Sequence, residues 1–269
     1  MAKPAQESAA AEENLPPAST PHQFSLRDLT GRELHDAIRS VPVSQDDEAL
    51  TEVKLTGAAG QANQLMNLDH PVRIEVEGSL GDYACALNSQ SDIRISGAVG
   101  HGVAEGMVSG KVRVRGNAGV GGGAAMAGGT LAIYGSAGDR CGAGMCGGGI
   151  FVRGDVGDEA GVGALRGTIV IGGDSGKNLG DAMSNATVFI RGRASSLAQG
   201  VRTRRVGSAS KRPLCRFLGH VFAREEEEEE EEDLRLVQEE DLLLVQEEDL
   251  LVQAEDKEWS PEKLKMAKK

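Results

Sequence analysis

Two kinds of residue in this 269-residue chain have types and spacings that could do chemistry. Cys141 and Cys146 form a C-x4-C pair that could help to bind a metal ion or an iron–sulfur cluster, but no second pair completes four ligands. We therefore interpret Cys141 and Cys146 as small residues that fill crowded positions of the fold. The glycine run 121–123 could cradle a phosphate, but that mechanism needs a helix N-terminus, and the pattern predicts strands here.

Other potential metal ligands are no better placed. The histidines are scattered and form no cluster with cysteines or acids at ligand spacing. They are His22, His35, His70, His101 and His220. Methionines 107, 126, 145 and 183 follow a 19-residue period, which is typical of core filling, although a soft metal-binding row is an alternative. We predict no catalytic, cofactor-binding or metal-binding residue in this chain.

The dominant feature is a glycine repeat. Glycine accounts for 37 residues, about twice the usual share of roughly 7%. The repeat has a strict period of 19 residues, and a further copy begins at Gly57. Seven glycines mark the period, and we predict that each lies in a structural turn. They are Gly78, Gly97, Gly116, Gly135, Gly154, Gly173 and Gly192. These positions give eight repeats over about residues 53–200.

Each repeat also carries a short strand. The residues four and two positions before the marker glycine are aliphatic in every copy, as in Ile74 and Val76. Apolar residues at spacing two share one face of a strand, and one such strand cannot bury that face alone. Stacked copies can bury it together. We therefore predict an all-β fold, a right-handed parallel β-helix of about eight 19-residue coils.

One outward-facing column changes character along the stack. Three positions before the marker glycine, early repeats carry charged residues such as Arg94 and Arg113, whereas later repeats carry apolar ones. The apolar stripe consists of Ala132, Phe151, Val170 and Phe189. Exposed apolar stripes are usually covered by another element or by a partner. The chain's own tail is one possible cover, but we predict that the stripe is an interface with another subunit.

The two ends differ from the repeat. We divide the chain into a disordered N-terminal arm (1–22), a capping segment (23–52), the β-helix (53–200) and a low-complexity basic and acidic tail (201–269). Thr30 and Glu33 fit a capping box that opens a short helix through about Ser40. The tail contains eight glutamates, 225–232, and then near-copies of an eight-residue unit that could form an amphipathic helix over about 233–254.

Composition excludes several classes of function. The net charge of -12 argues against nucleic acid as the main partner, because phosphate binding needs clustered Lys and Arg. No apolar stretch approaches the roughly 20 residues of a membrane-spanning helix. The first residues lack the basic start and apolar stretch of a secretory signal, and the four cysteines fit a reduced protein. We expect a cytoplasmic protein with no membrane partner.

Several stretches resemble a known family. Among them are TGRELHDAI from Thr30, GDYACALN from Gly81, RCGAGM from Arg140 and LGDAMSNATVFIRGRASSL from Leu179. With the glycine repeat, they resemble the glycine-rich (GXGXG) β-helix domain at the C-terminus of the glutamate synthase large subunit. They are similar above all to free-standing versions such as the N-methylglutamate synthase middle subunit. The resemblance covers about residues 24–200, and the tail departs from the family pattern.

The resemblance implies a scaffold rather than a catalyst. The expected partners are a class II glutamine amidotransferase-like subunit and a flavin-binding glutamate-synthase-like subunit. FMN and an iron–sulfur cluster would belong to a partner of this oxidoreductase complex of nitrogen and amino-acid metabolism, which forms glutamate or N-methylglutamate. One alternative is a scaffold like the β-helix subunit of a formylmethanofuran dehydrogenase-type complex, which shares the fold. Another is a free-standing β-helix enzyme acting on a polymer, although the outer positions show no clustered carboxylates.

Overall fold

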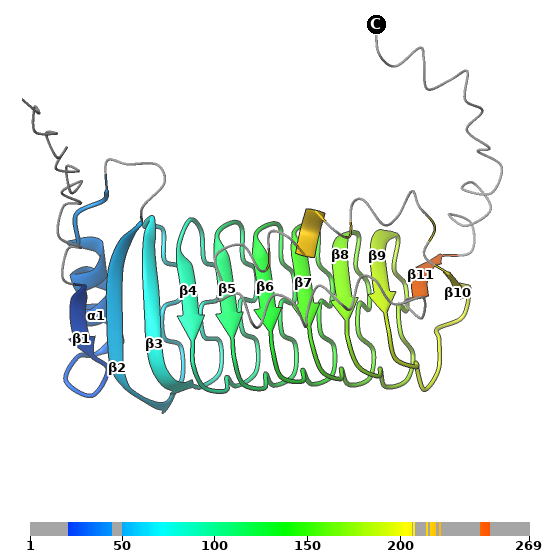
Figure 1. Cartoon of the computed structure of the whole chain (residues 1–269), viewed down its shortest axis with the longest axis horizontal. Helices are drawn as coiled ribbons and strands as arrows, with labels where there is room; N and C mark the ends of the chain where they lie inside the picture. Colours follow the sequence, from blue (N-terminus) through cyan, green and yellow to red (C-terminus); the bar gives the residue numbers. More distant parts are fainter. Residues whose placement is uncertain are drawn as a thin grey trace, which may run out of the picture.

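The described part of the chain forms one continuous sheet wound into a solenoid (Figure 1). The computed structural model describes residues 21–44, 50–205, 207, 214, 216–218, 221 and 243–247. In chain order the elements are β1 (His22–Ser25), α1 (Gly31–Arg39), β2 (Thr51–Gln61), β3 (Val72–Leu80), β4 (Asp92–Ile95), β5 (Lys111–Val114), β6 (Thr130–Ile133), β7 (Gly149–Val152), β8 (Arg166–Ile171), β9 (Asn185–Ile190), β10 (Val201–Arg205) and β11 (Leu243–Glu247).

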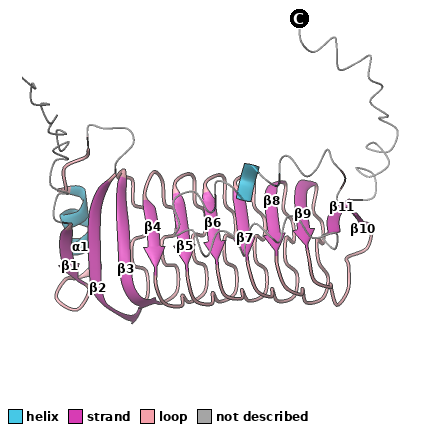
Figure 2. Ribbon diagram, in the orientation of Figure 1, coloured by secondary structure: helices cyan, strands magenta, loops and turns pink. Residues whose placement is uncertain are grey.

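Strands β2 to β9 stack in chain order, and each pairs in parallel with the next (Figure 2). Seven turns of the chain therefore link eight successive strands. The register follows the sequence repeat: Ile74 pairs with Ile93, and Ile93 with Val112. The predicted parallel β-helix is confirmed, and its ladder positions are those that the period indicated.

The coil interior is filled by aliphatic and sulfur-containing side chains. The strand residues two positions apart, such as Ile150 and Val152, are fully buried. Met107, Met126 and Met145 are also fully buried in the same apolar cluster. The methionine row therefore fills the core, where flexible side chains fit the irregular space between strands and turns.

From Gly97 onward, the marker glycines lie in the bend just after each strand. Close approach of neighbouring coils explains why these positions are glycine better than a left-handed backbone does. A Cβ on Gly116 would lie 2.7 Å from the backbone nitrogen of Ala98, and among the seven markers from Gly78 to Gly192 a positive φ occurs only at Gly78 (φ 113°). The coils pass so close together at this corner that no side chain fits between them.

Polar side chains tie consecutive coils together beside the marker glycines. Asp155 Oδ1 accepts a hydrogen bond of 2.7 Å from the Asp174 backbone N–H, and Asp174 Oδ1 accepts one from the Arg193 N–H. Asn117 and Ser136 occupy the same row in the two preceding coils and make the same contact. The row satisfies backbone donors that a bend would otherwise leave without partners.

The N-terminal segment covers the first coil. Thr30 and Glu33 form the expected capping box, with the Thr30 N–H donating to Glu33 Oε2 at 2.8 Å. The following helix, α1, buries Leu34 and Ile38. Strand β1, which the sequence analysis did not predict, pairs in parallel with β2 and begins at His22, inside the segment expected to be disordered. Residues 1–20 lie outside the described part.

The other end of the sheet is closed by the tail. Strand β11 lies between β9 and β10 and is antiparallel to both. Residues 243–247 therefore form a strand where the eight-residue unit suggested a helix, because they pair with the open edge of β9. The rest of the stretch 233–254 lies outside the described residues. Within the described part, no helix has the length and apolar character needed to cross a membrane.

Candidate interaction surfaces

The outward-facing apolar stripe lies where the sequence placed it, but it is not open. Its four residues stand side by side on β6 to β9, and each is at most 3% exposed. They pack with Leu214, Leu218 and Val221 in an apolar cluster separate from the coil core. The stripe of Ala132, Phe151, Val170 and Phe189, for which we predicted a subunit interface, is therefore covered within the chain itself. Residues of the chain's own tail cover them, and this contact removes the apolar stripe from water.

The covering segment consists of residues 214, 216–218 and 221, whose backbone is helical. It lies over β7 in Figure 1. Leu214, Leu218 and Val221 are four and three residues apart, so they fall on one side of a helix, and this side meets the stripe. The segment has no counterpart in the 19-residue repeat. Its position against the strands therefore could not be predicted from the period.

A second apolar row remains exposed among the described residues. It lies in the loops just before β5 to β8. Val108 and Leu165 are 56% and 52% exposed, and Ala127 and Cys146, on the two coils between them, are exposed as well. Backbone hydrogen bonds join these coils, as from Cys146 N–H to the Met126 carbonyl at 2.7 Å. Apolar side chains that are neighbours on a surface are candidates for protein contacts. This row was not predicted from the sequence, although the methionines one position earlier follow the same 19-residue period.

The two cysteines of the C-x4-C pair face opposite ways. Cys141 is buried in the core, and Cys146 is exposed to solvent. Desolvation raises the pKa of the Cys141 thiol to about 12, and it does the same for Cys85. Since metals and clusters bind the thiolate, this environment does not suit a ligand. Within the described part of the chain, no three His, Cys, Asp or Glu side chains gather closely enough to hold a metal ion.

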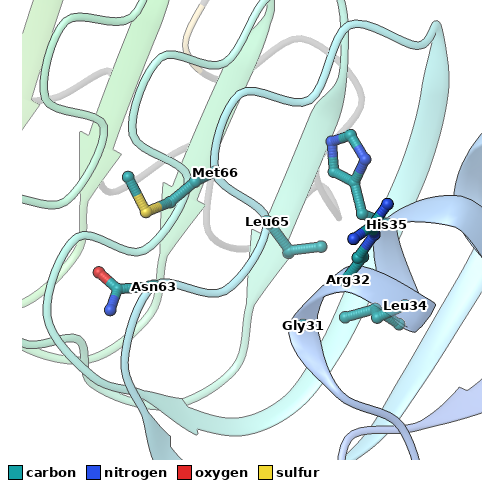
Figure 3. Close-up of a pocket in the computed structure, with 7 residues that line it drawn as sticks. All are labelled: Gly31, Arg32, Leu34, His35, Asn63, Leu65 and Met66. Carbon is teal, nitrogen blue, oxygen red and sulfur yellow. The ribbon is translucent and has the colours of Figure 1, made fainter.

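A crevice of about 220 Å³ opens where α1 meets the first coil (Figure 3). Leu34 and Leu65 form its apolar side, and Arg32 and His35 supply its polar groups. His35 Nε2 lies 3.2 Å from the Asn67 carbonyl oxygen. Among the seven lining residues, His35 is the one imidazole, and there is no carboxyl, hydroxyl or thiol group beside it to form a catalytic pair.

A larger pocket, of about 270 Å³, lies on the outer face of β3 to β6 beside the covered stripe. Its side chains carry charges of both signs. Arg113 is only 4% exposed and is held by an ion pair of 2.6 Å from Nη1 to Asp92 Oδ1. Its Nε donates to the Val221 carbonyl oxygen at 3.3 Å. The sequence analysis noted Arg94 and Arg113 as outward-facing residues but did not predict a pocket between them.

Comparison with known proteins gives two similarities. No family model matches the chain. It is similar to Protein GlxC of Rhizobium meliloti (strain 1021), with 32% identity over 83 residues, which are 31% of this chain and 36% of that protein. The match thus spans little more than a third of the relative. The chain also resembles a chain of the crystal structure of the formyltransferase/hydrolase complex (FhcABCD) from Methylorubrum extorquens in complex with methylofuran. That similarity has a TM-score of 0.48 and 20% identity, and covers 76% of this chain and 86% of the other.

Proposed function

We propose that this chain is a non-catalytic scaffold subunit of a glutamate-synthase-like complex. It would hold a class II glutamine amidotransferase-like subunit and a flavin-binding subunit in fixed positions. The motif resemblance over residues 24–200 supports the identity of the complex. The observation that carries a scaffold role is the exposed apolar row from Val108 to Leu165, which runs across four coils joined by backbone hydrogen bonds. Such a stack presents a straight, extended surface to partners.

The chemistry of the proposed complex would take place in the partners. Amino-group transfer to form glutamate or N-methylglutamate needs a nucleophile and a redox cofactor, which we assign to the amidotransferase-like and flavin-binding subunits. FMN and the iron–sulfur cluster would be bound there as well. The thiol environments support this division, because burial keeps Cys85 and Cys141 protonated and therefore poor ligands.

Affinity purification of the tagged chain from its native cells tests the proposal. We expect an amidotransferase-like protein and a flavin-containing protein to co-purify in fixed ratio with it. Changing Val108→Ser and Leu165→Ser together should reduce their recovery. The matched control is Val43→Ser, a valine of similar exposure (48%) that lies near the N-terminal cap. Recovery of formyl-transfer subunits instead would favour the alternative scaffold role, and recovery of the chain alone would contradict both.

A further inference from the structure

The mixed-charge pocket on β3 to β6 contains a guanidinium group that the described residues satisfy incompletely. Arg94 lies in register between Glu75 on β3 and Arg113 on β5. Its Nε atom is buried and has no hydrogen-bond partner among the described residues. A buried donor without a partner is costly, and native structures rarely retain one without a reason.

Charged residues near Arg94 form ion pairs with other residues. Arg113 is neutralised by Asp92, at 2.6 Å. On the opposite wall, Glu77 is paired with Lys54 at 2.5 Å. Glu75 faces Arg94 across the strand pair, but no ion pair joins these two described side chains. Asp92 and Glu77 thus form ion pairs with other basic residues. The Arg94 guanidinium lines the pocket, and its buried Nε has no hydrogen-bond partner among the described residues.

The shape of the pocket adds a place for a ligand. Ser96, at the position that Glu77 and Arg115 occupy in the neighbouring repeats, is the smallest side chain that lines the pocket. Ser96 Oγ accepts a hydrogen bond of 2.9 Å from the Gly78 N–H, so its own hydroxyl hydrogen is directed away from that bond. Tyr134 and Arg115 also line the pocket.

We propose that this pocket binds a carboxylate group, with the Arg94 guanidinium as its main contact. A carboxylate matches the paired N–H donors of an arginine, and Arg94 lines the pocket without an ion pair to another described residue. A single negative charge also suits the pocket better than a doubly charged phosphate does, because Glu75, which forms no ion pair with the described residues, repels an anion in proportion to its charge. This site is separate from the exposed apolar row and does not depend on the proposed scaffold role.

The carboxylate can come from within the chain or from another molecule. Glu225, the first residue of the acidic run, is four residues beyond Val221, whose carbonyl oxygen is bonded to Arg113. Four extended residues span roughly 13–14 Å, which brings the run within reach of the pocket. A separate carboxylate ligand is the other source, and the experiment distinguishes the two.

The test measures binding of a dye-labelled octaglutamate peptide to the full chain by fluorescence anisotropy. It compares the natural chain with a variant in which all eight glutamates of 225–232 are changed to Gln. In both backgrounds, Arg94→Gln should weaken binding at least about tenfold, the loss expected for a charged hydrogen bond, and Arg94→Lys should weaken it less. The control is Arg140→Gln, an exposed arginine on another wall that is paired with Glu159.

Each outcome has a definite meaning. Tighter peptide binding to the eight-glutamine variant would identify the chain's own glutamates as the carboxylate source. Equal binding to both backgrounds, lost with Arg94→Gln, would identify a separate ligand. Binding that Arg94→Gln leaves unchanged, while the variant unfolds at the normal temperature, would overturn the proposal. So would competition by inorganic phosphate as strong as that by glutarate at matched ionic strength.

Discussion

The ring of Phe217 lies directly against the backbone of Gly149, where a Cβ on the glycine would overlap it. On the strands on either side, the same outward position is occupied by Thr130 and Thr168. A gap in this column therefore admits the tail, and the tail covers the apolar stripe. The pairing explains why this end of the solenoid can keep Phe151 and Phe189 on its outer face without exposing them.

Replacing this glycine should release the covering segment. Gly149 does not have a left-handed backbone, so Gly149→Val leaves the strand intact but removes the space for Phe217. We expect faster hydrogen exchange at residues 214–221. Thr168→Val, at the same position of the next strand, is the control and should leave exchange unchanged. Equal protection in both variants would contradict the packing described here.

Removing an aromatic ring of the stripe should destabilise the isolated chain. Phe151 is fully buried and lies edge-on to Tyr134, with ring centroids 6.2 Å apart. We expect Phe151→Ser to lower the free energy of unfolding by about 3 kcal/mol or more, as for a core aromatic. Denaturant unfolding of the purified chain measures this. A stripe that serves only as a subunit interface would give no loss in the isolated chain.

Two glycines with opposite constraints test the account of coil stacking. Gly116 has an ordinary backbone but lies against Ala98, so Gly116→Ala should cost about 1–3 kcal/mol through overpacking. Gly144 has a left-handed backbone (φ 62°) with open space around it, and Ala125 adopts the same conformation one coil earlier (φ 53°). Gly144→Ala should therefore cost about 1 kcal/mol through left-handed backbone strain alone, because no neighbouring atom has to move. A larger loss of stability for Gly144→Ala than for Gly116→Ala would mean that backbone conformation, and not close approach, restricts these positions to glycine.

The buried thiols predict a loss of stability at alkaline pH. Desolvation raises the pKa of Cys85 and of Cys141 from 9.0 to about 12 in the folded chain. Above about pH 9 the unfolded chain releases these protons first. Stability is therefore fully present below pH 9 and falls as the pH rises toward 12, by roughly 1.4 kcal/mol per pH unit for each thiol. The double variant Cys85→Ala, Cys141→Ala should show a shallower decline. An identical pH profile would contradict the burial of these thiols.

Most of the solenoid could be predicted from the sequence because its constraints repeat. Ile93 and Val112 had to share a register, since a 19-residue period without insertions permits no slip in a parallel stack. The capping box at Thr30 was equally visible, because its hydrogen bonds join residues three positions apart. Local and periodic constraints are the ones that a single sequence displays.

The surfaces depend on contacts between segments that share no period. The apolar cluster that contains Leu218 and Phe151 joins the tail to the body, and neither segment's sequence shows where the other lies. Strand β11 formed because an open sheet edge was available, which outweighed the pattern that suggested a helix. The pocket at Arg94 arises from which acids pair with which bases, and that depends on side-chain geometry rather than on spacing.

Reconstitution of the purified subunits tests the scaffold proposal most directly. The chain, the amidotransferase-like subunit and the flavin-binding subunit would be mixed, and the mass of the assembly and its glutamine-dependent amino transfer would be measured. We expect one complex that contains all three and transfer that requires this chain, with Val108→Ser and Leu165→Ser together reducing both. If the other two subunits assemble and work at full rate without this chain, the proposal is contradicted.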